Sequence, residues 1–332
     1  MSGRNRTVVI TGSSAGVGRA TARAFAREGA RIALIARGRE RLEATKHEVE
    51  ALGVKSLVLP LDVADAAAIE AAAAQTEEEL GPIDVWVNNA MTSVFSPVRE
   101  MDAEDYKRVT EVTYLGYVYG TLAALKRMLP RNHGVIVQVG SSLAYRGIPL
   151  QSSYCAAKHA IQGFVESLRC ELLHDRSKVR VTMVQLPALN TPQFSWVKSR
   201  LPRKLQPMGP IFQPEVAADA IVWASHHNRR EIFVSGSTVK AILANRLAPG
   251  LLDYYLARTG VEGQQHDGPA DPNAPNNLYQ PVPGEYAARG AFTEQARGNS
   301  VQLWGTKHRG WVILGAIVMG IAASALLQNG DD

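Results

Sequence analysis

Cysteine is scarce in this chain of 332 residues, which contains only Cys155 and Cys170. Two thiols cannot build the disulfide framework of a small secreted domain, and both lie in a stretch with a helical pattern. We therefore expect core thiols in a reducing compartment. A secretory signal is also lacking, because the apolar run after "MSGRNR", "TVVI", is too short for one and leads directly into a glycine-rich turn.

The chain also lacks a strong charge of one sign. Its formal net charge of +5 is spread along the sequence, which argues against nucleic acid as a partner and leaves room for an anionic cofactor or a membrane surface. No cluster of cysteine, histidine and carboxylate residues accompanies the pair His226 and His227, so no metal site is expected.

Hydrophobic residues make up 46% of the chain, enough for one large core. Short apolar segments alternate with helical patterns, which predicts an α/β fold: a doubly wound, parallel, seven-stranded sheet of Rossmann type. Strands are expected at residues 7–10, 31–36, 55–59, 84–88, 135–140, 180–185 and 232–234, and helices at 18–28, 40–52, 66–80, 103–128, 153–173 and 214–224. Ligands of such folds bind beyond the carboxyl ends of the strands.

A glycine-rich turn follows the first strand, in "VITGSSAGVGRATARAFA". Glycine lets the backbone approach a pyrophosphate closely, and the helix that follows offers unpaired N–H donors. The alternative is a turn that needs glycine for its geometry alone. The cofactor-binding residues expected here are Thr11, Gly12, Ser13, Ser14, Gly16, Val17 and Gly18.

Five motifs share the order and spacing of one known family. They are "TGSSAGVG" at 11–18, "LDV" at 61–63, "NNA" at 88–90, "GSS" at 140–142 and "YCAAK" at 154–158. Over about residues 5–240 the chain thus resembles the short-chain dehydrogenase/reductase family. The resemblance implies a nicotinamide cofactor and a reaction at a carbonyl or secondary alcohol.

Tyr154 and Lys158 lie four positions apart in "SSYCAAKHA". On a helix they share a face, and a neighbouring ammonium should lower the pKa of the phenol from about 10 towards neutrality. The resemblance implies that Tyr154 is the general acid/base and that Lys158 also holds the nicotinamide ribose. The family's usual spacing from the catalytic serine to the tyrosine is thirteen, which selects Ser141, with Ser142 as the alternative.

The sequence departs from the family at the residue that supports a proton relay. Many members have an asparagine in the long helix before the serine, whereas "EVTYLGYVYG" places Thr113 there. A threonine can still hold water, but the relay is in doubt. A second departure is Met91, where a glycine is typical; it either narrows the nicotinamide end of the pocket or packs.

The residues at the end of the predicted second strand indicate which nicotinamide cofactor is bound. Ala36 occupies the place of the acidic residue that selects NAD, and Arg37 follows it, which favours NADP(H) over NAD(H). Arg39 is a second candidate for the phosphate, and either arginine could instead be a solvated loop residue. By resemblance, Asp62 and Val63 border the adenine, Asn88 and Ala90 line the path to the ribose, and Pro187 and Thr191 lie near the carboxamide.

The domains expected are a catalytic domain at 1–261, a linker or extended surface arm rich in Pro, Asn and Gly at 262–303, and a hydrophobic C-terminal anchor helix and tail at 304–332. Residues 311–327 carry no charge, and a helix of this length nearly spans a bilayer. Flanking charges place the enzyme domain in the cytoplasm. The alternative is a short buried helix in a soluble cytoplasmic protein.

The function predicted is an NADP(H)-dependent oxidoreductase. Apolar residues in "QLPALNTPQFSWVKSRLPRKLQPMGP" at 185–210 suggest a lid over a lipophilic carbonyl or alcohol, although a solvated loop is an equal interpretation. Alternative functions are a catalytically idle dinucleotide-binding sensor or scaffold, for which loss of Tyr154 or Lys158 would be typical, and an epimerase or dehydratase of the same fold. The resemblance also implies that the protein can form a homo-oligomer through its long helices.

Overall fold

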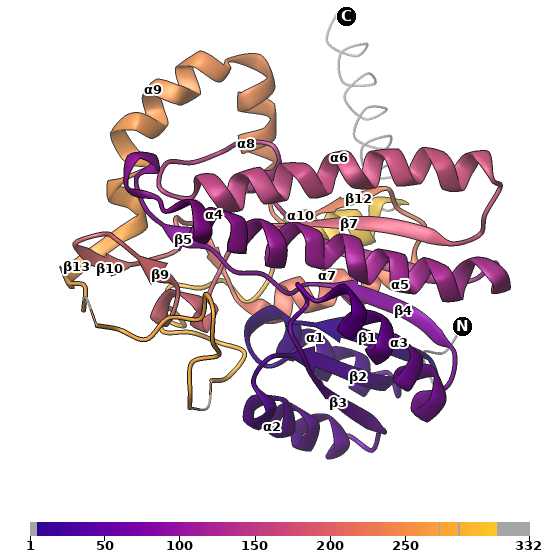
Figure 1. Cartoon of the computed structure of the whole chain (residues 1–332). Helices are drawn as coiled ribbons and strands as arrows, with labels where there is room; N and C mark the ends of the chain where they lie inside the picture. Colours follow the sequence, from indigo (N-terminus) through magenta and orange to yellow (C-terminus); the bar gives the residue numbers. More distant parts are fainter. Residues whose placement is uncertain (1–4, 272, 285, 311–332) are drawn as a thin grey trace, which may run out of the picture.

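The computed structural model of the chain describes residues 5–271, 273–284 and 286–310. Its centre is a parallel seven-stranded sheet with the order β12-β7-β6-β4-β1-β2-β3 (Figure 1). The strands are β1 (Thr7–Thr11), β2 (Arg31–Ala36), β3 (Ser56–Pro60), β4 (Ile83–Asn88), β6 (Val135–Ser141), β7 (Arg180–Leu186) and β12 (Glu231–Phe233). The strand order reverses between β1 and β4, and this switch point is where open α/β sheets bind ligands.

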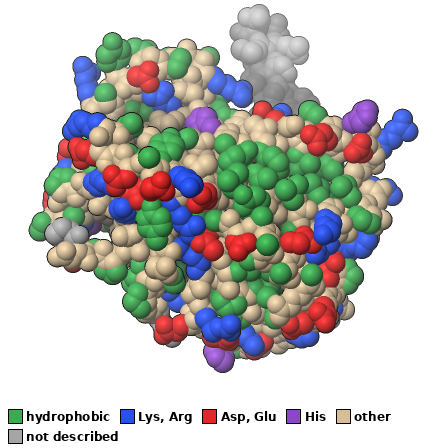
Figure 2. Space-filling view, in the orientation of Figure 1, with side chains coloured by type: hydrophobic (Ala, Val, Ile, Leu, Met, Phe, Trp, Pro, Cys, Tyr) green, Lys and Arg blue, Asp and Glu red, His purple; other side chains and the backbone are tan. Residues whose placement is uncertain are grey.

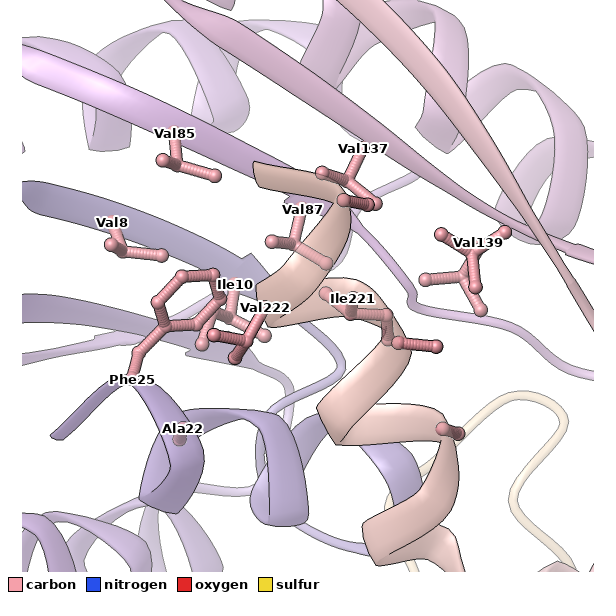
Figure 3. Packing of buried hydrophobic residues seen from close by; sticks show 14 of the residues in the cluster. Val8, Ile10, Ala22, Phe25, Val85, Val87, Val137, Val139, Ile221 and Val222 are labelled. Atoms are coloured by element: carbon pink, nitrogen blue, oxygen red, sulfur yellow. The ribbon is translucent and has the colours of Figure 1, made fainter. Parts of the chain in front are cut away.

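Helices cover both faces of the sheet. On one face lie α1 (Gly16–Arg27), α2 (Arg39–Glu50) and α7 (Pro214–His226); on the other lie α3 (Ala66–Leu80), α5 (Gly116–Arg131) and α6 (Ser152–His174). Figure 3 shows the first layer, in which Phe25 of α1 and Ile221 of α7 pack against valines of β1, β4 and β6. Each fully buried Val, Ile or Phe contributes roughly 1.5–3 kcal/mol. Because the strands are covered by helices on both faces, the sequence of each strand is a short continuous run of apolar residues.

The helix expected at 103–128 is interrupted. The structure divides it into α4 (Ala103–Thr110), a π-helical turn η2 (Glu111–Leu115) and α5. Within the turn, the buried hydroxyl of Thr113 donates to the carbonyl oxygen of Thr92 at 2.8 Å and accepts from the Thr92 N–H at 3.0 Å. This tertiary contact accompanies the wider turn, a feature often found next to functional sites.

Two helices after β12 were not predicted. They are α8 (Gly236–Leu247) and α9 (Pro249–Thr259), joined at Ala248 as a hairpin at the upper left of Figure 1. Ser235 caps α8 by accepting a hydrogen bond from the N–H of Thr238 at 3.3 Å.

Shorter elements surround the carboxyl edge of the sheet. Three two-stranded pairs are formed by β5 (Val94–Phe95) with β9 (Lys198–Ser199), β8 (Ala188–Leu189) with β11 (Ile211–Phe212), and β10 (Arg203–Leu205) with β13 (Gln265–Pro269). The remaining elements are the 3₁₀ turns η1 (Val98–Glu100), η3 (Ser142–Ala144), η4 (Pro192–Ser195) and η5 (Glu262–Gln264), and the helix α10 (Val301–Lys307).

The arm after α9 folds back onto the catalytic domain. Beyond β13 it is mostly irregular, yet Leu278, Val282 and Ala288 are buried. Leu278 packs against Val94 and Val109, and Ala288 packs against α1 and α7. The arm is therefore part of the folded body of the molecule.

The predicted anchor, residues 311–327, lies outside the described residues. Within the part of the chain that the structure describes, no helix combines the length and the apolar character needed to cross a membrane.

Candidate functional site

A cavity of about 620 Å³ opens at the carboxyl edge of the sheet. It extends from the glycine-rich turn, past the ends of β2, β4 and β6, to the segment at 185–210, where a lid is expected, and to α8 and α9. The predicted residues among its lining are Gly12, Ser14, Gly16, Val17, Arg37, Asp62, Val63, Ala90, Ser141, Tyr154, Lys158, Pro187 and Thr191. The structure therefore brings most of the predicted site to one place.

Three predicted residues of the glycine-rich turn stabilise the turn from the side that faces away from the cavity. The Thr11 hydroxyl accepts the backbone N–H groups of Asn89 and Ala90 at 2.9 and 3.1 Å. The Ser13 hydroxyl donates to the carbonyl oxygen of Ile35 at 3.3 Å. A Cβ on Gly18 would lie 2.1 Å from the carbonyl oxygen of Gly12. These residues fix the turn and are absent from the cavity lining.

Asn88 does not line the path to the ribose as expected. Its buried amide donates to the Tyr117 carbonyl oxygen, Thr121 Oγ1 and Gln138 Oε1 at 3.1–3.2 Å, and its oxygen accepts from the Trp86 indole. A strand alternates its side chains between two faces, and here Asn88 points into the core between β4, β6 and α5. The next residue, Asn89, lines the cavity instead.

The glycine-rich turn forms a cradle of backbone groups. Gly12 and Gly16 have φ angles of +68° and +55°, and a Cβ on Gly12 would lie 2.8 Å from Ala90 Cα. Glycine is thus needed for the conformation and for the close approach. No side chain caps the start of α1, so its first N–H groups and its dipole favour an anion such as a pyrophosphate.

Tyr154 and Lys158 lie together on α6. Lys158 Nζ is 5.5 Å from the centre of the Tyr154 ring and 4.6 Å from that of Tyr117. The ammonium donates to the carbonyl oxygen of Val139 at 2.8 Å and to the Tyr117 hydroxyl at 3.1 Å. Lys158 is thereby fixed at the bottom of the cavity.

The expected lowering of the tyrosine pKa is wrong for this arrangement. Burial raises the pKa of Tyr154 above its ordinary value, and the neighbouring Ser141 side chain acts in the opposite direction without overcoming burial. Burial also lowers the pKa of Lys158 to about 7. Desolvation disfavours both charged forms, and it outweighs the attraction that the spacing suggested.

Tyr117 was missed at the sequence level. Its buried hydroxyl accepts from Lys158 and donates to the carbonyl oxygen of Val139 at 3.0 Å. Thr113, where the family has asparagine, is bound to Thr92 and is absent from the cavity lining. Tyr117 contacts Lys158 across 41 positions of the chain, so local spacing in the sequence could not indicate this contact.

Ser141 rather than Ser142 lies at the tyrosine. Ser141 is the last residue of β6, and its hydroxyl accepts from the N–H of Leu143 at 3.1 Å. The same hydroxyl forms a hydrogen bond with the Tyr154 phenol, which favours a lower pKa of that phenol. Ser142 also lines the cavity as the first residue of η3. A hydroxyl from each of β6 and α6 therefore faces the same space, as binding and protonation of a substrate oxygen require.

Guanidinium groups gather at the other end of the cavity. Arg37 and Arg41 line it, and Arg108 donates to the Asp62 carboxylate beside them. Arg41 was missed; its guanidinium carbon lies 5.0 Å from the Trp196 ring centre and 4.9 Å from that of Tyr286. Arg39, the second candidate, is exposed and pairs with Glu43 at 3.8 Å. The positive charge of Arg37 and Arg41 fits an anionic group on the ligand.

The end of the cavity beyond Tyr154 is lined largely by apolar side chains. These come from the segment after β6, the lid and the hairpin of α8 and α9, and include Leu143, Ile148, Phe194, Met208, Leu252 and Leu256. Met91 lines the cavity as well.

Comparison with known proteins agrees with this geometry. A family model described as short chain dehydrogenase matches residues 6–200. An uncharacterized oxidoreductase of Bacillus subtilis, YxnA, is 32% identical over 331 residues, covering 98% of this chain and 91% of the relative. A 3-dehydrosphinganine reductase of Danio rerio is 33% identical over 223 residues, covering 65% and 67%.

Two further similarities concern a named substrate and a bound cofactor. A fatty acyl-CoA reductase of Acinetobacter baylyi is 31% identical over 223 residues, covering 67% of this chain and 73% of the relative. An alcohol dehydrogenase structure from the archaeon Thermococcus sibiricus, complexed with 5-hydroxy-NADP, matches with a TM-score of 0.60 and 28% identity. That match covers 69% of this chain and 95% of the other.

Proposed function

The chain belongs to the short-chain dehydrogenase family and is an oxidoreductase, and from this premise we propose that it reduces a lipophilic carbonyl compound with NADPH or oxidises the corresponding alcohol. The observation that carries the proposal is a single cavity. Tyr154, Lys158 and Ser141 face it between the glycine-rich cradle and an apolar pocket.

The residues of the chain fit a nicotinamide dinucleotide along this cavity. The nicotinamide supplies or accepts the hydride when it is bound. Ser141 Oγ would bind the substrate oxygen, and the Tyr154 hydroxyl would donate its proton to that oxygen in reduction or remove it in oxidation. The high pKa of Tyr154 keeps the phenol protonated, which suits the direction of reduction.

Charge at the adenosine end supports NADP(H). Ala36 leaves no carboxylate at the end of β2, while Arg37 and Arg41 line the cavity beside it. A 2′-phosphate would be attracted by these guanidinium groups, whereas NAD(H) has an uncharged 2′-hydroxyl at that position.

A lipophilic substrate is supported by the apolar end of the cavity and by its surroundings. Leu247, Leu251 and Tyr254 of the α8–α9 hairpin are 83%, 74% and 71% exposed, and other residues of the hairpin line the cavity. Apolar surface on both sides of the hairpin suits a substrate that arrives from a lipid phase. The names of two relatives, a fatty acyl-CoA reductase and a 3-dehydrosphinganine reductase, indicate lipid-derived substrates for those proteins.

Membrane attachment through residues 311–327, with the catalytic domain in the cytoplasm, is the second part of the proposal. It rests on the charge-free stretch that follows Lys307, His308 and Arg309 in the sequence.

A homo-oligomer formed through α5 and α6 is the third part. Figure 2 shows a broad hydrophobic area over these helices, where Leu122, Leu129 and Leu173 are 56%, 43% and 72% exposed. Such a patch marks an interaction surface.

The experiment that tests the function is a screen of the purified protein against ketones and aldehydes of increasing chain length. Oxidation of NADPH should accelerate with long-chain carbonyls, and Arg37→Ala should raise the KM for NADPH by a larger factor than the KM for NADH. Equal losses with both cofactors would refute the role of Arg37 in phosphate selection. Absence of NADPH- or NADH-dependent turnover across the screen would refute the proposed reaction.

A further inference from the structure

The C-terminal arm crosses the cofactor half of the cavity. We call residues 276–284 and 286–297 the strap. Asn277, Pro281 and Val282 of the strap line the cavity together with the glycine-rich turn and the end of β2. In Figure 1 the strap begins in the irregular, light orange ribbon beyond β13, at the lower left.

Arg37 holds the first part of the strap. Its guanidinium donates to the carbonyl oxygen of Leu278 at 3.2 Å and to that of Asn277. The Leu278 side chain is fully buried, and Arg108 donates to the same carbonyl oxygen at 3.1 Å. The residue proposed to bind the 2′-phosphate thus also fastens the strap.

The middle of the strap covers the start of α1. The Gly16 N–H, one of the donors of the cradle, points to the Ala287 carbonyl oxygen at 3.4 Å. Arg19 donates to the Tyr286 carbonyl oxygen at 2.7 Å. The Tyr286 ring packs edge-on against Trp196 of the lid with ring centres 4.4 Å apart, and it also flanks Arg41.

The last part of the strap contacts the segment between β8 and η4, which contains Thr191. The Gly290 N–H donates to the Asn190 carbonyl oxygen at 3.2 Å, and a Cβ on Gly290 would lie 2.5 Å from the Thr191 carbonyl oxygen. The strap is thus fastened at Arg37, at the start of α1 and beside Thr191, around the glycine-rich cradle.

We propose that the strap is the outer wall of the NADP(H) site and that it must lift for the nucleotide to enter or leave. The identity of the ligand, NADP(H), rests on the proposed function. Because Arg37 holds the strap and faces the cavity, a bound phosphate and a closed strap share one guanidinium, so nucleotide exchange is coupled to strap opening. Closure of such an element commits a ligand and slows its release.

The structure offers a direct way to lock the strap. A Cβ built on Gly38 lies 3.5 Å from Pro281 Cβ, within the range that a disulfide spans. Gly38 has a φ of −83°, which other residues adopt readily. We would combine Gly38→Cys and Pro281→Cys in a Cys170→Ser background, since Cys170 is an exposed thiol and not the core thiol that the sequence predicts.

Exchange of NADPH is then followed by its fluorescence, without a substrate. Oxidation of the empty double variant should slow NADPH association roughly tenfold or more, and oxidation after loading should retain NADPH through desalting until a reductant is added. The matched control is the same double variant kept under reductant, which should exchange NADPH faster than its oxidised form by the same factor.

Three outcomes would overturn the inference. Unchanged exchange in the cross-linked protein would show that the strap is no gate, while the cofactor assignment would stand. Failure of the two cysteines to cross-link would contradict the closed position of the strap. Failure of the unmodified protein to bind NADPH would refute the cofactor proposal itself and the strap inference with it.

Discussion

Lys158 shows how burial sets the chemistry of the site. It is 1% exposed, and its ammonium is held by a carbonyl oxygen and a phenol rather than by a carboxylate. Without a negative partner, desolvation lowers the pKa of Lys158 to about 7. The lysine is therefore partly neutral near physiological pH, and a cofactor or substrate group that approaches it would alter its charge.

The pKa of Lys158 predicts a pH-dependent stability. The unfolded lysine has a pKa of about 10.5, so between pH 7 and 10 the unfolded state binds more protons and stability rises with pH. The free energy of unfolding of the natural protein should rise relative to that of Lys158→Met by about 1.4 kcal/mol per pH unit over this window. Urea unfolding of both proteins at pH 7.5, 8.5 and 9.5 measures the difference. A difference independent of pH would contradict the assigned pKa.

Among single residues of the site, the sequence predicted those that are related by a short, regular spacing. Tyr154 and Lys158 were found because positions i and i+4 share a helix face, and Gly12 and Gly16 because their turn needs glycine. Tyr117 reaches Lys158 across 41 positions, so only packing could show their contact. The direction of the Tyr154 pKa was missed for the same reason, since burial cannot be read from spacing.

The hairpin of α8 and α9 is the element that connects the cavity to the surface. Leu252, Tyr255 and Leu256 line the cavity, while Leu247 and Leu251 are exposed. Basic side chains at Arg246 and Arg258 accompany them in the sequence. An apolar face with basic neighbours suits contact with a lipid surface.

Charging the exposed face of the hairpin should impair only substrates delivered in lipid. Leu247→Asp combined with Leu251→Asp should raise the KM for a long-chain carbonyl in anionic vesicles about tenfold or more, because two leucines lose their apolar contact. Steady-state kinetics with a short, water-soluble carbonyl should be unchanged. Leu52→Asp, on an exposed leucine outside the cavity lining, serves as the control. Equal effects on both substrates would contradict this role of the hairpin.

Elements with a strong local pattern were predicted, and those set by tertiary contacts were not. All seven strands of the sheet agree with their expected positions to within one or two residues, because strands buried on both faces are apolar throughout. The π turn depends on the bond between Thr113 and Thr92, which are distant in sequence. The hairpin was missed because its helices expose apolar residues and lack a clear amphipathic period.

At the scale of the whole molecule, the chain after α9 returns to the glycine-rich end of the cavity and then forms α10, whose Leu303 lies in the core. Buried Leu278, Val282, Ala288 and Leu303 attach this segment to the catalytic domain. Its composition, rich in Pro, Asn and Gly, showed that it would be irregular but not where it would lie, because its contacts are with residues far away in the sequence.

Removal of the chain from Gly310 onward tests the proposed membrane attachment. The full chain should sediment with membranes from the expressing cells, whereas the shortened chain should remain in the supernatant, because the charge-free stretch is lost. Since α10 and its contacts remain, both forms should turn over a water-soluble carbonyl at similar rates. An unchanged distribution between the two fractions would refute the anchor.

Replacement of Tyr154 by phenylalanine tests whether its hydroxyl transfers the proton in the proposed NADPH-dependent reaction. We expect this variant to bind NADPH like the natural protein, by fluorescence titration, while its rate of carbonyl reduction falls by about 10²-fold or more. Tyr255→Phe, which changes another tyrosine of the same cavity, should keep nearly full activity. Undiminished turnover in Tyr154→Phe would show that Tyr154 is not the proton donor.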